Sequence, residues 1–167
     1  IVTIEDPIEY VLGNSKDNTC LVTSREVGTD VKSYREGAED ALRMNPTAIM
    51  IGEIRDEETA RAALNLGESG HLVISTMQST TVEGAIFKLW ALTASHPGAQ
   101  TSISSCLRGI IRTSLIPSKD RTQYVSAYEF MLNQGDFAKQ IATGNAQNNQ
   151  AQNLRSLLDG SRRSHGS

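Results

Sequence analysis

Acidic residues directly follow two short apolar segments of this 167-residue chain. Residues 1–4 are followed by Glu5 and Asp6, and residues 48–51 are followed, after one glycine, by Glu53. If both segments are strands of one parallel sheet, these acids gather at the carboxyl ends of the strands, where open α/β sheets bind ligands. Carboxylates there can hold a divalent cation and orient a water molecule. One acid after a strand merely starts a loop, but two favour a functional site built on Glu5 and Glu53.

Strand and helix patterns alternate along the chain around these acids. The apolar, β-branched runs are typical of short strands that are covered on both faces. A strand–helix–strand rhythm predicts an α/β fold with a mostly parallel sheet and flanking helices. The predicted strands cover residues 1–4, 48–51 and 71–76, and a polar loop is predicted over 12–24.

Two helices are predicted between these strands from their N-cap residues. Ser33 precedes an amphipathic segment that Asn45-Pro46 stops. Asp56 precedes a second helix with acids in its first turn, where the positive end of the helix dipole favours them, and Gly67 ends it. For Asp56 we favour the capping role over a role in binding.

The remaining sequence predicts a smaller, helical part. The expected domain limits are 1–94 for the α/β core, 95–143 for a helical C-terminal subdomain, and 144–167 for a polar linker, a short helix and a disordered tail. Near the end of the core we expect a helix with Val82, Ala85, Ile86 and Leu89 on one face. After Pro97-Gly98 we expect a helix that aligns Ile103, Leu107, Ile110 and Ile111, then a strand over 124–132 and a short helix over 135–143.

Composition excludes several classes of protein. The net charge of −3 and the pI near 5.6 argue against a large basic surface for nucleic acid. No apolar run approaches the ~18 residues that cross a bilayer. Cys20 and Cys106 form no CxxC pair, which excludes a cysteine zinc site and favours a reduced, cytoplasmic setting. Because the chain opens at Ile1, inside a predicted strand, we expect it to be a piece of a longer polypeptide.

Three blocks of this sequence resemble the secretion ATPase superfamily, which comprises motors of type II secretion, type IV pili and type IV secretion. IVTIEDPIEY resembles its acidic box, and REVGTDVKSYREGAEDALRMNP is similar to the segment that follows. AIMIGEIRDEETARAALNLGESGHLVIST resembles its Walker B motif running into its histidine box. The blocks keep the family's order and spacing over residues 1 to about 90, and the resemblance weakens beyond.

The resemblance implies a RecA-like ATPase core that works with ATP and Mg²⁺ as a homohexamer. Glu5 would polarise the attacking water, and Glu53 would hold Mg²⁺ directly or through a water. His71 would be the first histidine of the histidine box, near the nucleotide. Arg25 and Arg43 would contact phosphate, including that of a neighbouring subunit, although for Arg43 a solvated helix face beside Glu39 and Asp40 is an equal alternative.

Several positions depart from the family's pattern. The phosphate-binding loop GxxxxGK[ST] is absent, so we expect the isolated chain to bind ATP poorly and to have no useful ATPase activity. Gln78 occupies the place of the second histidine and can donate a hydrogen bond but carry no charge. Glu39 stands at a usual arginine, and Asn45 and Thr47 replace acids that often flank the proline. Arg55 lies in the block that resembles Walker B, and a structural ion pair with Glu57 or Glu58 is as good an interpretation of this residue as a functional role.

Three functions follow from these observations. The first is an ATP-hydrolysing motor subunit for type IV pilus assembly or retraction, or for type II or IV secretion. The second is a hydrolysis-deficient scaffold or regulatory ring subunit of the same machinery. The third is a DNA-translocating RecA-like ATPase, which the acidic pI disfavours. The resemblance places the protein at the cytoplasmic face of the inner membrane with platform proteins as partners, and no direct nucleic acid contact is expected.

Overall fold

A computed structural model describes residues 1–12, 19–118 and 121–143 of the chain. The chain divides into two compact units, the first spanning Ile1–Gln78 and the second starting at Ser79. This division lies before the expected domain limit at residue 94, and the assignment of the chain to functional domains stays a prediction. The predicted linker, short helix and tail over 144–167 lie outside the described residues.

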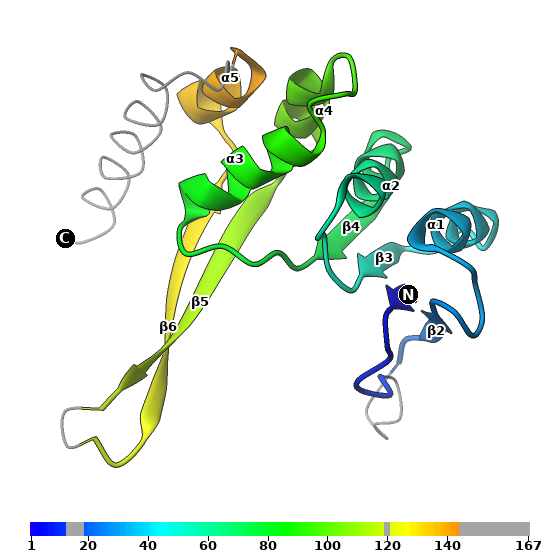
Figure 1. Ribbon diagram of the computed structural model, residues 1–167, viewed down its shortest axis with the longest axis horizontal. Coiled ribbons are helices and arrows are strands. Elements are labelled where there is room, and N and C mark those ends of the chain that lie inside the picture. Colours follow the sequence, from blue (N-terminus) through cyan, green and yellow to red (C-terminus); the bar gives the residue numbers. More distant parts are fainter. Residues whose placement is uncertain (13–18, 119–120, 144–167) are drawn as a thin grey trace. The chain divides into compact units, whose positions relative to one another are not determined.

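A four-stranded parallel sheet forms the centre of the first unit (Figure 1). The strand order is β2-β1-β3-β4, and each neighbouring pair is parallel. This confirms the predicted α/β architecture with a mostly parallel sheet. The strands are β1 (Val2–Glu5), β2 (Thr23–Glu26), β3 (Ala48–Ile51) and β4 (Leu72–Ser75).

Helices α1 (Tyr34–Arg43) and α2 (Glu57–Glu68) contact each other and the sheet. Ile4, Ile49 and Ile51 are fully buried between the sheet and these helices. Small residues line the helix side of this core, which allows close packing: Ala38 and Ala41 of α1, with Ala62 of α2. Because each helix connects two parallel strands, it starts at the carboxyl end of the sheet and returns to the amino end.

Both helices begin at the predicted N-cap residues. The Ser33 hydroxyl accepts a hydrogen bond from the Glu36 backbone N–H at 3.2 Å. The Asp56 carboxylate accepts one from the Thr59 N–H at 2.8 Å, and the Thr59 side chain completes a capping box. These caps satisfy backbone groups that the first turn of a helix leaves unpaired, and they fix where each helix leaves the sheet.

The second unit contains three helices and an antiparallel hairpin in its described part. The predicted helix through Ile111 is wrong, because α4 ends at Cys106 and residues 109–117 form a strand. β-branched residues fit a strand, and pairing with residues 124–132 decides for it. The elements are α3 (Val82–Leu92), α4 (Ala99–Cys106), β5 (Gly109–Pro117), β6 (Tyr124–Leu132) and α5 (Gly135–Thr143).

Strand β2 is a second difference from the prediction, because its residues fall at the end of and after the predicted loop over 12–24. Its polar sequence, TSRE, carries no strand signal, and it is only partly buried at the edge of the sheet. Backbone pairing with β1 therefore makes the strand. Within the described residues, every helix is too short or too polar to cross a membrane.

Candidate functional site

Glu5 is the last residue of β1 and is buried, with 8% of its surface exposed. Its Oε1 accepts a hydrogen bond from the Thr3 hydroxyl at 2.6 Å. Ile4, between them, packs against α1, where a Cβ added at Gly37 would lie 2.9 Å from its Cγ2. Since alternate side chains point to opposite faces of a strand, Thr3 and Glu5 point to the face away from α1. The hydroxyl thus fixes the direction of a carboxylate at the carboxyl end of the sheet.

Glu53 lies just beyond the carboxyl end of β3, the strand that pairs directly with β1. The backbone around it is held on both sides. The Gly52 N–H donates to the Ile4 carbonyl at 2.8 Å, and the Ile54 N–H donates to the Thr76 carbonyl at 2.8 Å. The Thr76 hydroxyl donates to the Gly52 carbonyl at 2.7 Å. The structure therefore brings Glu5 and Glu53 to the same end of adjacent strands, as the sequence predicts.

Arg55 contacts two acids that lie just beyond the ends of different strands. One Nη atom lies 2.5 Å from Asp6 Oδ2, and the other lies 3.4 Å from Glu53 Oε1. From the sequence, an ion pair between Arg55 and an acid at the start of α2 is an equal alternative. The structure shows that this alternative is wrong. Arg55 bridges the ends of β1 and β3 instead.

Burial and neighbouring charges shift the pKa values of Arg55 and of Tyr34, which is buried. Desolvation lowers the pKa of Arg55, but the hydrogen bond to Asp6 and the charge of Glu53 raise it, and the net shift is upward. Tyr34, the first residue of α1, is 6% exposed. Burial raises the pKa of Tyr34, against the opposing charge of Arg55. Tyr34 is thus a neutral phenol near a permanent cation.

His71 and Gln78 lie at opposite ends of β4. His71 immediately precedes the strand, and its Nδ1 is 3.0 Å from the Ser69 hydroxyl. Because β4 runs parallel to β3, His71 lies at the amino end of the sheet, away from Glu5 and Glu53. Gln78 follows the carboxyl end of β4. The structure therefore does not bring His71 to the predicted carboxylates, and its role stays a prediction.

The two predicted arginines occupy different surroundings. Arg25 lies in β2, beside β1, and its Nε atom is buried with no hydrogen-bond partner among the described residues. Arg43 ends α1 and pairs with Asp40 at 2.5 Å on an exposed face. The exposed ion pair of Arg43 fits the alternative in which this residue lies on a solvated helix face. Arg25, in contrast, has a buried N–H donor without a partner among the described residues.

Asp6 and Tyr34 are contacts of this site that the sequence does not mark as functional. Asp6 is visible only as an acid beside Glu5, and Tyr34 appears only as an apolar position of a helix. No sequence signal identifies Arg55 as their common partner, because the residues lie far apart along the chain.

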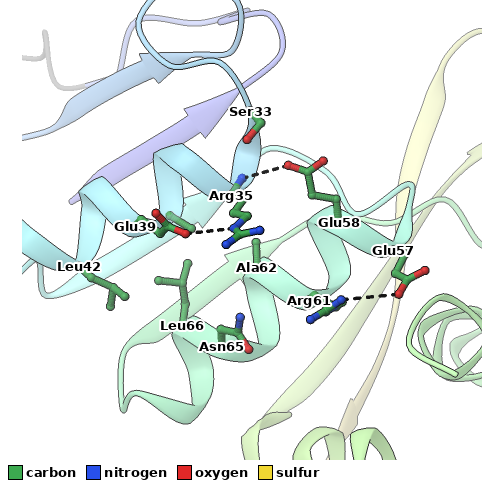
Figure 2. Close-up of a pocket in the computed structure, with 11 residues that line it drawn as sticks. Ser33, Arg35, Glu39, Leu42, Glu57, Glu58, Arg61, Ala62, Asn65 and Leu66 are labelled. Atoms are coloured by element: carbon green, nitrogen blue, oxygen red, sulfur yellow. Dashed lines mark hydrogen bonds and ion pairs between the residues drawn. The ribbon is translucent and has the colours of Figure 1, made fainter. Parts of the chain in front are cut away.

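A groove of about 720 Å³ lies between α1 and α2. Figure 2 shows ion pairs along it, Arg35 with Glu39 and Arg61 with Glu57. Its apolar lining includes Leu42. None of the predicted site residues lines this groove, so it is separate from the carboxylates.

Glu53 is a solvent-accessible carboxylate at the carboxyl end of the sheet, which is the kind of group that binds a divalent cation. No cluster of three or more His, Cys, Asp or Glu side chains suited to a metal occurs among the described residues. Mg²⁺ in nucleotide sites commonly uses one or two carboxylates, with phosphate oxygens and waters as the other ligands. Glu53 is partly exposed, with 31% of its side chain accessible, and its carboxylate is a donor of the required kind.

Comparisons with known proteins identify the family of this chain. The type II/IV secretion system protein family matches residues 1–159. The type IV pilus retraction ATPase PilT of Pseudomonas aeruginosa is 38% identical over 134 residues, which cover 79% of this chain and 38% of PilT.

Solved structures show the same fold. A crystal structure of the pilus retraction motor PilT with bound ADP gives a TM-score of 0.80 at 35% identity, covering 95% of this chain and 44% of that one. The ATPase DotB of Legionella pneumophila gives 0.81 at 26% identity, covering 95% and 43%. The chain thus spans less than half the length of these relatives. It belongs to the type II/IV secretion system protein family.

Proposed function

We propose that this chain carries the catalytic carboxylates of an ATP-hydrolysing motor subunit that powers a type IV pilus or a type II or IV secretion machine. The observation that supports this most is the placement of Glu5 and Glu53 at the same end of adjacent parallel strands. Relatives of this chain include pilus ATPases and type II secretion proteins. Because the chain spans less than half of PilT, the activity is assigned to the full-length polypeptide that contains it.

Glu5 is the proposed general base. Phosphoryl transfer depends mostly on positioning and on charge neutralisation, so it needs a carboxylate that holds the attacking water in line. The hydrogen bond from Thr3 restricts the rotation of this carboxylate and leaves its second oxygen for a water. A buried position strengthens such an interaction, because competing solvent is scarce.

Glu53 is the proposed ligand of Mg²⁺, directly or through a water. The cation, when bound with ATP, supplies neutralisation of the negative charge on the phosphates. The backbone hydrogen bonds from Gly52 to β1 and from Ile54 to Thr76 hold the segment that carries Glu53. This is the support expected for a metal ligand on a loop.

Four further residues are proposed to contact the nucleotide. Gln78 lies beyond the carboxyl end of β4, and Arg25 has a buried donor without a partner in the described chain. His71 and Arg43 lie toward the amino end of the sheet, so we assign them contacts with a nucleotide held by a neighbouring subunit. That assignment requires a homohexamer, docked on inner-membrane platform proteins at the cytoplasmic face.

The test compares ATP hydrolysis by this chain and by the full-length polypeptide, with Mg²⁺ and with EDTA. We expect Mg²⁺-dependent hydrolysis by the full-length polypeptide only, because the 167 residues contain no GxxxxGK[ST] loop. Turnover by the chain alone would refute the need for that loop. Absence of turnover by the full-length polypeptide would refute the motor.

Gln78 supports a second candidate, a hydrolysis-deficient scaffold of the same machinery. A glutamine cannot carry the positive charge of a protonated histidine. In this case the full-length polypeptide binds ATP and assembles but does not turn it over. Binding of a fluorescent ATP analogue without phosphate release would distinguish the scaffold from the motor.

A further inference from the structure

Arg55 lies in a turn whose backbone is hydrogen-bonded on both sides. The turn leaves β3 at Gly52, which bonds to β1, and passes Ile54, which bonds to Thr76 beyond β4. It ends at Asp56, the N-cap of α2. The Cα of Arg55 therefore has a defined position between three strands and a helix, and its guanidinium reaches the site from there.

The guanidinium does not pair with the two acids in the first turn of α2. Glu57 pairs with Arg61 at 3.9 Å along α2. A Glu58 oxygen lies 3.4 Å from the Arg35 backbone nitrogen. Arg55 instead reaches Asp6, 49 residues away, and the side chain of Glu53.

These contacts contribute little to the free energy of folding, but they fix the orientation of the two carboxylates. The side chains of Arg55, Asp6 and Glu53 are 45%, 43% and 31% exposed. Ion pairs with such exposure contribute little to folding, because water screens them. A planar guanidinium, however, presents its two Nη groups at a fixed angle and so orients both carboxylates at once.

We infer that Arg55 is a positioning residue, which uses Asp6 as an anchor on β1 to aim the carboxylate of Glu53. This inference rests on the proposed function, in which Glu53 holds Mg²⁺ for ATP. Tyr34 packs beside this turn: it is 6% exposed, and its hydroxyl would lie 3.5 Å from a Cβ added at Gly52. Asp6, Arg55 and Glu53 thus link the ends of β1 and β3 through side chains, in addition to the sheet.

The test uses Arg55→Gln, Arg55→Lys and Asp6→Asn in the full-length polypeptide. Arg61→Gln is the matched control, because this exposed arginine pairs only with Glu57 among the acids of the described residues. Removing a group that orients a metal ligand typically costs about 10–100-fold in activity or metal affinity. We expect Arg55→Gln to lower kcat by about tenfold or more and to raise the Mg²⁺ concentration for half-maximal rate, with KM for ATP at saturating Mg²⁺ changed less than about threefold.

The conservative and anchor variants separate positioning from charge. Lysine keeps the charge but cannot hold two carboxylates in a planar fork, so Arg55→Lys should recover only part of kcat. Asp6→Asn should reproduce the defect of Arg55→Gln, and the double variant should add little to either one. A full recovery by lysine, or additive defects, would overturn the inference.

Amide hydrogen exchange in this chain tests the inference without a measurement of ATP turnover. Arg55→Gln should speed exchange at the Ile54 N–H by about tenfold, while the Gly52 N–H, bonded within the sheet, keeps its rate. Unchanged exchange at Ile54 would overturn the positioning role even if the motor is correct. If exchange responds but the wild-type polypeptide hydrolyses no ATP, the proposed function fails and the positioning of Glu53 stands.

Discussion

Removal of the Asp56 cap should destabilise the first unit by a predictable amount. The carboxylate accepts hydrogen bonds from the Thr59 N–H and from the Thr59 hydroxyl, both at 2.8 Å. Loss of an N-cap costs about 0.5–2 kcal/mol. Because two hydrogen bonds are lost, we expect Asp56→Ala to lower the free energy of unfolding by about 1–2 kcal/mol. For a unit of this size, about 1 kcal/mol corresponds to about 4–8 °C in Tm.

The effect of this cap depends on pH in a defined direction. The Thr59 backbone hydrogen bond lowers the pKa of Asp56 in the folded state. A carboxyl group with a depressed pKa contributes stability above its unfolded pKa, near 3.9, and loses it as the pH falls through the folded value. The difference between wild type and Asp56→Ala should therefore be full at pH 7 and smaller at pH 3.

Urea unfolding followed by far-UV circular dichroism measures both effects. Asp40→Ala is the matched control, because this helical aspartate makes an exposed ion pair with Arg43 and caps nothing. We expect the control to stay within about 0.5 kcal/mol of wild type. An equal loss in both variants, or an Asp56→Ala deficit of the same size at pH 3, would refute the capping argument.

Three further outcomes are expected. Gly37→Ala should lower the free energy of unfolding by about 1–3 kcal/mol despite a helix gain of ~1 kcal/mol, because its Cβ meets the buried Ile4 Cγ2 at 2.9 Å; urea unfolding with unchanged or higher stability would contradict this. Gln78→His should raise kcat of the full-length polypeptide, and an unchanged kcat excludes position 78 as the limit on rate. Ile111 and Phe130 lie directly opposite on the hairpin and are 72% and 63% exposed, so replacing both by serine should reduce self-association in sedimentation velocity; unaltered association would argue against this surface.

Local signals explain why most of the first unit could be predicted. The apolar runs of β1 and β3 and the caps Ser33 and Asp56 act within a few residues of where they stand. The order of strands and helices then requires a parallel sheet, and a parallel sheet places Glu5 and Glu53 at the same end. This part of the site follows from the sequence.

Non-local contacts decide the elements that the sequence did not predict. The segment over 109–117 has apolar positions that fit one face of a helix, and only its partner strand over 124–132 makes it β5. The polar strand β2 forms because β1 offers it a backbone edge. In both cases the deciding contact is with a segment distant in the sequence, which a local pattern does not contain.

The same reason separates the predicted and the unpredicted parts of the site. Arg55 pairs with Asp6, and not with the acids at the start of α2, because the turn after β3 directs the side chain toward the end of β1. His71 belongs to the motif by sequence, yet the parallel direction of β4 places it at the other end of the sheet. Spacing along a chain thus identifies residue types, and strand direction decides which of them meet.

The most direct test of the account is single-turnover ATP hydrolysis by the full-length polypeptide carrying Glu5→Gln or Glu53→Gln, with Glu57→Gln as the exposed control. Loss of a general base costs about 10²–10⁴-fold, so Glu5→Gln should abolish most turnover while ATP still binds. Glu53→Gln should weaken Mg²⁺-dependent binding and turnover together, and the control should match wild type. Hydrolysis at the wild-type rate in both site variants would contradict the assignment of these carboxylates to a magnesium-bound nucleotide.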